Sequence, residues 1–280
     1  MEHILTDVQF DRSRRLALRL AGIELFERHR ELLRRRCRRM GILNPASFDA
    51  LLSPAEGGDP AAGQRFLGLV TTRFTGFFRH PWHFEGAGRH AVEAAARRGK
   101  ASLWSAAAAT GEEPYSLAMA LIEAFQTIDL PARVLATDIN EQALAAAQAG
   151  EYGEAALRGL TPERRARFFS ESAHTKRWHL APAVRRLVEF RALNLVDPAW
   201  PIEGQFDVIF CRNVLMYLEQ GCRRRVLERM ASLLQPDGLL VLDPVEHLGP
   251  AGELFTPGKN GLYSLCPSST TSARRRSSPH

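Results

Sequence analysis

The sequence predicts an α/β protein, with a doubly wound, mostly parallel sheet after a helical N-terminal region. Beyond residue 63, short apolar segments alternate with helical segments, a pattern typical of parallel strands joined by helices. Over residues 1–52, apolar residues recur every three or four positions, without the alternation of strands. Of the 280 residues, 45% are hydrophobic and 24% are charged, which indicates a globular chain rather than a disordered or fibrous one.

The N-terminal region contains a strongly basic helix over residues 25–40. One arc of its helical wheel is apolar, and the opposite arc holds Arg28, Arg30, Arg34, Arg35, Arg38 and Arg39. Arg36 falls in the apolar arc. There it either extends along the surface to solvent or, as we favour, donates an ion pair to a neighbouring domain. The Pro- and Gly-rich residues 53–63 predict a linker.

Apolar segments predict the strands of the sheet at residues 101–106, 133–136, 187–192, 206–211 and 238–242. Helices are expected over residues 114–125, 141–149 and 223–234. Residues 253–256 and 261–265 predict an antiparallel hairpin that closes the sheet. Residues 267–280 are rich in Ser, Thr, Pro and Arg, which predicts a disordered basic tail.

The net charge of +6 is unevenly distributed, because residues 12–39 carry +8 and residues 274–276 add +3. Such a basic module indicates an acidic partner (nucleic acid, anionic lipid or an acidic protein surface) or only a solvated helix face. No apolar run has the length of a membrane span, and the first residues lack the pattern of a signal peptide. The four cysteines form no CxxC pair, so we expect a cytoplasmic protein without disulfides or a metal site.

The loop at residues 106–114 stands where a nucleotide-binding sheet has its glycine-rich loop. It contains one glycine and two acids, Glu112 and Glu113, which would repel a pyrophosphate at the start of the next helix. A ligand with a positive charge, such as an amino group or a sulfonium, is favoured instead. Alternatively, the two glutamates only cap the helix, with Pro114 in its first turn.

Two further loops follow predicted strands. Asp138 ends the second strand, where a carboxylate commonly accepts both hydroxyls of an adenosine ribose; alternatively, Asp138 or Asn140 caps the next helix. Arg212 and Asn213 directly follow a strand and indicate a ligand rim, or else a loop pair that satisfies itself. Before the sheet, residues 71–81 interleave aromatics with arginines. This fits either base stacking with phosphate binding, or a lid whose arginine binds a carboxylate.

Together these segments resemble the CheR family, the chemotaxis receptor glutamate methyltransferases. The matching runs are TTRFTGFFRHPWHFE, LWSAAAATGEEPYSLAMAL, LATDINEQALAAAQAGEY, FDVIFCRNVLMYLE and LFTPGKNGLYSL, in agreeing order and spacing from about residue 8 to residue 266. The resemblance implies a helical N-terminal domain with linker over residues 1–62. It implies a class I methyltransferase domain over residues 63–266, with a Rossmann-like sheet and a short β-rich insertion.

The resemblance also implies S-adenosylmethionine as methyl donor, S-adenosylhomocysteine as product and receptor glutamate carboxylates as acceptors. By position, the cofactor site would comprise Arg73, Thr75, Arg79, Glu113, Asp138, Asn194, Leu195, Arg212 and Asn213. Asp138 would bind the ribose, and Glu113 would face the positively charged methionine portion. Arg79 and Tyr217 would be the catalytic residues, beside the transferred methyl group. The acceptor is already ionised at pH 7, so no general base is expected.

The partner implied by the resemblance is the acidic helical bundle of a chemoreceptor's cytoplasmic domain. It would dock through Arg28, Arg34, Arg35, Arg38 and Arg39. Residues 169–187 contain no glycine, unlike the insertion of family members that bind a receptor's C-terminal pentapeptide, so we expect an untethered enzyme. We also expect a monomer, without a nucleic-acid partner or membrane insertion. The alternatives are a noncatalytic S-adenosylmethionine-binding signalling module and a nucleic-acid methyltransferase.

Some positions depart from the pattern of the family. Arg73 stands in place of an asparagine that contacts the cofactor, and His29 in place of a lysine. Residues 243–247 replace a Gly-His-Ser-Glu-like run and keep only its glutamate, Glu246. The arginine at position 73 bears on the affinity for the cofactor and leaves the predicted fold unchanged.

Overall fold

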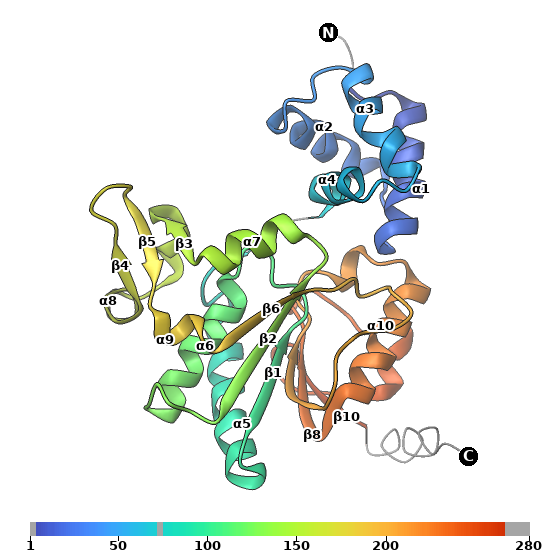
Figure 1. The fold of residues 1–280 in the computed structure, drawn as a ribbon. Coiled ribbons are helices and arrows are strands. Elements are labelled where there is room, and N and C mark those ends of the chain that lie inside the picture. Colours follow the sequence, from blue (N-terminus) through green and yellow to red (C-terminus); the bar gives the residue numbers. More distant parts are fainter. Residues whose placement is uncertain (1–3, 72–74, 267–280) are drawn as a thin grey trace.

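A seven-stranded sheet lies at the centre of the fold, with helices on both faces (Figure 1). The computed structural model describes residues 4–71 and 75–266; the predicted tail, residues 267–280, and Arg73 lie outside them. The strand order β6-β2-β1-β7-β8-β10-β9 is parallel from β6 to β8 and antiparallel around β10, which confirms the predicted sheet and its hairpin. The strands are β1 (Ala101–Ser105), β2 (Ala132–Asp138), β6 (Val188–Ala192), β7 (Phe206–Phe210), β8 (Leu234–Val241), β9 (Phe255–Pro257) and β10 (Leu262–Leu265).

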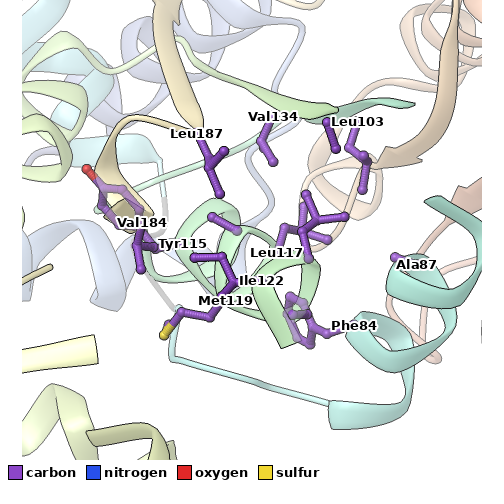
Figure 2. Packing of buried hydrophobic residues seen from close by; sticks show 14 of the residues in the cluster. Phe84, Ala87, Leu103, Tyr115, Leu117, Met119, Ile122, Val134, Val184 and Leu187 are labelled. Atoms are coloured by element: carbon purple, nitrogen blue, oxygen red, sulfur yellow. The ribbon is translucent and has the colours of Figure 1, made fainter. Parts of the chain in front are cut away.

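Successive residues of the parallel strands enter two separate apolar cores. Leu103 of β1 points into the core under α5 (Pro81–Arg98) and α6 (Glu112–Phe125), which Figure 2 shows. The next residue, Trp104, joins the core under α10 (Gln220–Leu233) on the other face. Strands buried on both faces have near-continuous apolar sequences, which is why they could be predicted. Within the described ranges, no helix is long and apolar enough to cross a membrane.

The β-rich insertion implied by the resemblance is present as a three-stranded antiparallel sheet of order β3-β5-β4. It follows α7 (Glu141–Ala149), whose bounds agree with the prediction. The insertion consists of β3 (Glu151–Gly153), η2 (Glu154–Gly159), α8 (Pro162–Phe168), β4 (Phe169–Glu171), β5 (Arg177–Leu180) and α9 (Pro182–Arg185). Phe77 packs edge-on against Tyr152 and Phe169, with ring centroids 4.9 and 5.4 Å apart. The insertion therefore supports the turn that precedes α5.

The N-terminal helical region extends further than predicted. It contains α1 (Asp7–Ala21), η1 (Glu27–His29), α2 (Arg30–Arg39), α3 (Pro45–Glu56) and α4 (Pro60–Val70). The prediction of a linker over residues 53–63 was wrong, because α3 and α4 occupy all of it except a turn at residues 57–59. Proline is well accepted at the first position of a helix, and Asp59 caps α4 by accepting the Ala62 N–H at 2.7 Å. The apolar cluster of these helices runs through Val70, so we propose a domain boundary there rather than at residue 62.

The basic helix predicted over residues 25–40 is divided between η1 and α2. Arg30, at the junction, pairs with Asp7 and Glu27. It is therefore not part of the exposed arginine face that the helical wheel predicted. Arg36 donates a hydrogen bond from Nη1 to the Leu69 carbonyl oxygen, 2.6 Å away. This contact connects α2 with the end of α4 inside the N-terminal region.

The N-terminal region is joined to the edge of the sheet by backbone pairing at residues 22–24. Ile23 forms an antiparallel bridge with Leu218, flanked by two backbone hydrogen bonds of 2.9 and 2.8 Å. The Asn194 side chain adds a hydrogen bond to the Leu20 carbonyl oxygen at 2.8 Å. The end of α1 is therefore fixed against the segments that follow β6 and β7.

We expect Gly22→Ala to destabilise the protein more than its matched control, Gly41→Ala. Both glycines have positive φ, 62° and 74°, where an L-residue costs about 1–2 kcal/mol. A Cβ at Gly22 would also lie 2.8 Å from Val196 Cγ1, whereas nothing lies within 4 Å of one at Gly41. Urea unfolding should give a loss about 1–3 kcal/mol larger for Gly22→Ala. Equal losses would contradict the close approach of α1 to the sheet edge.

Candidate functional site

A cleft opens at the carboxyl ends of β1, β2 and β7, where the strand order reverses on either side of β1. Ligands of doubly wound sheets bind at this place. The cleft encloses about 1040 Å³, including its open mouth, and Ala21, Ile23 and Val70 of the N-terminal region form part of its wall. Of the residues predicted from the sequence, it brings together Thr75, Arg79, Glu113, Asp138, Asn194, Leu195, Arg212, Asn213 and Tyr217.

Asp138, the last residue of β2, is oriented by the surrounding backbone. Its Oδ2 accepts the Ala109 N–H and its Oδ1 accepts the Asn140 N–H, both at 2.8 Å. The cap of α7 is Asn140, which accepts the Ala143 N–H at 3.1 Å, so the capping alternative holds for Asn140 and not for Asp138. Because a carboxylate oxygen can accept two hydrogen bonds, this orientation is compatible with a ligand diol.

The first turn of α6 places a buried acid at the cleft. Glu113 accepts a hydrogen bond from Ser105 Oγ at 2.8 Å and pairs with Arg212, whose Nη1 lies 3.0 Å from Glu113 Oε2. Burial raises the pKa of Glu113, and the Arg212 guanidinium opposes that shift. The interpretation of Glu112 and Glu113 as simple caps was wrong, because Gly111 is the cap residue. Glu113 was expected to face the positive charge of a ligand. In the structure its carboxylate already has a counter-charge, because Arg212 supplies the one that a buried carboxylate needs.

Buried charges of alternating sign continue from this pair. Arg212, 2% exposed, donates from Nη2 to the Arg79 carbonyl oxygen at 3.0 Å. Asp243, equally buried, has its Oδ2 3.3 Å from Arg79 Nη2 and 3.8 Å from Arg212 Nη2. We call Glu113, Arg212, Asp243 and Arg79 the charge ladder. Its most exposed member is Arg79, at 29%, which also lines the cleft.

Arg79 lies in a strained turn. The flanking residues Phe78 and His80 have φ values of 49° and 63°, which non-glycine residues adopt at an energetic cost. The Phe78 N–H donates to Ser116 Oγ at 2.9 Å, and the Arg164 guanidinium lies 3.7 Å from the centre of the Phe78 ring. Such strain persists only where the surrounding structure enforces it. Packing around Phe78 therefore fixes the turn and the direction of the Arg79 side chain.

Glu246 holds the loop that follows β7, and sequence reasoning did not include it among the site residues. Its buried carboxylate accepts four backbone N–H groups, those of Asn213, Val214, Met216 and Asp243. Burial raises the pKa of Glu246, and these hydrogen bonds oppose the shift. The loop is thus satisfied internally, while Asn213, at φ 58°, still lines the cleft. The available signal was that Glu246 alone is retained where residues 243–247 depart from the family pattern.

Asn194 and Tyr217 connect the cleft with the N-terminal region. The Asn194 side-chain Nδ2 donates to the Leu20 carbonyl oxygen at 2.8 Å and to Asp197 Oδ1 at 3.0 Å, so this side chain has a structural role. Tyr217 belongs to η3 (Leu215–Tyr217) and lines both the cleft and an apolar groove shared with Leu32 of α2. The groove and the cleft therefore share one wall.

The arginines predicted to dock a partner lie on η1 and α2. Arg28, Arg35, Arg38 and Arg39 are exposed. Arg34 is half-buried, and its Nη1 lies 3.8 Å from Glu31 Oε2. The exposed arginines leave a basic surface on the helix that also contributes to the groove beside Tyr217.

Fold and cleft define the class of the protein. A seven-stranded sheet that is parallel from β6 to β8 and antiparallel around β10, with a cleft at the reversal of strand order and an acid at the end of β2, is the arrangement of a class I methyltransferase.

Comparisons with known proteins specify the family. Residues 73–259 match the family model described as "CheR methyltransferase, SAM binding domain". Over 262 residues the chain is 35% identical to "Chemotaxis protein methyltransferase 2" of Pseudomonas aeruginosa, covering 92% of this chain and 93% of that protein. It is 35% identical over 265 residues to the "Chemotaxis protein methyltransferase" of Escherichia coli, covering 93% and 92%. For that of Klebsiella aerogenes the identity is 39% over 269 residues, covering 93% and 90%. The chain belongs to the CheR methyltransferase family.

We expect Glu246→Gln to destabilise the protein and weaken S-adenosylmethionine binding. A glutamine replaces one acceptor oxygen by an N–H donor that faces backbone N–H groups. The expected loss in free energy of unfolding is about 1–3 kcal/mol. The matched control is Asp207→Asn, a buried carboxylate that accepts the Ser102 N–H at 2.7 Å and does not line the cleft. Denaturant unfolding and calorimetric titration test both variants. Unchanged affinity in Glu246→Gln would contradict a role of this carboxylate in shaping the cleft.

Proposed function

We propose that this chain transfers the methyl group of S-adenosylmethionine to glutamate side-chain carboxylates in the cytoplasmic domain of a chemoreceptor. The products are S-adenosylhomocysteine and glutamate methyl esters. Membership of the CheR family, and relatives named chemotaxis protein methyltransferases that match along nearly their whole length, support methylation in chemotaxis over the noncatalytic alternative. The observation that carries the choice of acceptor is Arg79, an arginine that lines the cleft, because guanidinium groups bind carboxylates bidentately.

S-Adenosylmethionine fits the chemistry of the cleft. In this proposal Asp138 accepts the ribose hydroxyls, and Ile139 and Leu195 provide an apolar wall for the adenine. The Glu113–Arg212 pair offers both signs of charge to the ammonium and carboxylate of the methionine portion. The remaining contacts are assigned to Thr75, the main chain of Asn194, and Asn213.

The residues of the chain act by alignment. When bound, S-adenosylmethionine supplies an electrophilic methyl carbon. Arg79 binds the acceptor carboxylate and directs one of its oxygens, and the Tyr217 hydroxyl donates a hydrogen bond to it. No residue needs to act as a general base, because glutamate is ionised at pH 7. Alignment contributes up to about 7–11 kcal/mol in favourable cases, and the apolar walls exclude water from the reacting carboxylate.

The acceptor reaches the cleft by docking on the exposed arginines of η1 and α2. An acidic helical bundle complements this basic surface, and such complementarity raises the rate of association. Residues 172–176, which connect β4 and β5, contain no glycine, and this supports direct docking rather than a peptide tether. The groove on the helix that carries these arginines shares Tyr217 with the cleft, so a docked bundle would lie next to the cleft.

Labelled methanol is the readout for this function. The chain is incubated with methyl-labelled S-adenosylmethionine and a chemoreceptor cytoplasmic fragment, and mild base then releases volatile methanol from any methyl ester. Arg79→Ala should lower this release by about 100-fold because the carboxylate is no longer aligned. Arg97→Ala, in the last turn of α5, the helix that follows Arg79, is the matched control and should leave the release unchanged.

Three results would contradict the proposed function or its acceptor residue. Near-normal methanol release from Arg79→Ala would remove Arg79 from acceptor binding. Bound cofactor without any base-labile product would favour the noncatalytic module. Label found in added DNA or RNA would favour a nucleic-acid methyltransferase.

Reversing charge on α2 tests the docking surface. Arg38→Glu combined with Arg39→Glu should raise KM for the receptor fragment about tenfold and leave the affinity for S-adenosylmethionine unchanged. The difference from wild type should shrink as salt is raised, because exposed charges are screened. Arg14→Glu with Arg15→Glu, an exposed pair on α1, is the control. Equal effects of both pairs on KM would show that the net charge of the chain, and not the surface on α2, determines receptor binding.

A further inference from the structure

Asp243 places a buried negative charge directly behind Arg79. Its side chain is 2% exposed, and its Oδ2 lies 3.3 Å from Arg79 Nη2, 3.6 Å from His80 Nε2 and 3.8 Å from Arg212 Nη2. Its Oδ1 accepts the Val245 N–H at 3.3 Å. One carboxylate oxygen therefore faces three basic side chains.

The charge balance of the ladder gives Asp243 a specific partner. Glu113 already pairs with Arg212 at 3.0 Å, and Asp243 is the carboxylate that lies beside Arg79. Burial alone would raise the pKa of Asp243. Backbone and side-chain hydrogen bonds and the two guanidiniums outweigh burial and lower it, so Asp243 is ionised at neutral pH. Burial and the same guanidiniums lower the pKa of His80, which adds no positive charge there.

The contact between Asp243 and Arg79 constrains one edge of the guanidinium. Among the described residues, Asp243 Oδ2 accepts no hydrogen bond of good geometry, so the attraction across 3.3 Å is mainly Coulombic. A guanidinium has five N–H donors in a rigid plane. It can therefore face a carboxylate behind it and still present donors to another carboxylate in the cleft.

We propose that Asp243 is a positioning residue for methyl transfer: by holding the Arg79 guanidinium from behind, it sets where the acceptor carboxylate lies in the cleft. Asp243 is absent from the lining of the cleft, so it acts through the guanidiniums that line it, and Arg79 at 3.3 Å is nearer than Arg212 at 3.8 Å. The acceptor it serves is the carboxylate of a glutamate side chain. This inference rests on the proposed function of Arg79.

A double-mutant cycle with Arg79 tests the inference on the full chain. Asp243→Asn should lower kcat/KM for the receptor fragment about tenfold, with the affinity for S-adenosylmethionine within about twofold of wild type. In the Arg79→Ala background the same substitution should change kcat/KM by less than about twofold, because the group it acts through is gone. Asp207→Asn is the matched control. Asp207 is an equally buried aspartate paired with Arg98 at the opposite end of β7, so its loss should leave kcat/KM unchanged.

Each other outcome overturns the inference. A tenfold loss in both backgrounds, or an equal loss in Asp207→Asn, would show a merely structural role. An unchanged or raised kcat/KM in Asp243→Asn would show that Asp243 is dispensable or competes with the acceptor. Asp243→Ser supplies the same comparison if Asp243→Asn does not fold. Failure of the proposed function is distinct, because wild type itself would then form no base-labile methyl ester.

Discussion

The burial of the Arg212 guanidinium is the constraint on which the cleft depends. A charged side chain with 2% exposure is stable only where carboxylates and carbonyl oxygens surround it. Glu113 comes from the first turn of α6, the Arg79 carbonyl oxygen from the turn before α5, and Asp243 from the end of β8. These segments are far apart in the chain, and satisfying one guanidinium brings them to the same edge of the sheet.

The same edge joins the sheet to the N-terminal helices. Ile23 pairs with Leu218, and Val70 at the end of α4 completes the wall of the cleft. Arg36 of α2 donates to the carbonyl oxygen of Leu69, one residue before that wall. The helix with the exposed arginines is therefore hydrogen-bonded beside the wall of the cleft.

Sequence reasoning succeeded where the physical cause is local or periodic. The strands were predicted because parallel strands are buried on both faces, and Asp138 was placed at the cleft because it ends one of them. The prediction of a linker at residues 53–63 failed because proline and glycine also suit the ends of helices, as at Pro60. The partners of Arg212 could not be predicted, since Glu113 is 99 positions away and Asp243 follows a different strand.

The most direct test of the cleft as the cofactor site is a crystal structure of the chain with S-adenosylhomocysteine. We expect the ribose hydroxyls within hydrogen-bond distance of Asp138 and the sulfur at the end of the cleft that holds Arg79 and Tyr217. The charge ladder should remain in place, with Arg212 still paired to Glu113. A product bound outside this cleft, or a ribose turned away from Asp138, would contradict the assignment of the site.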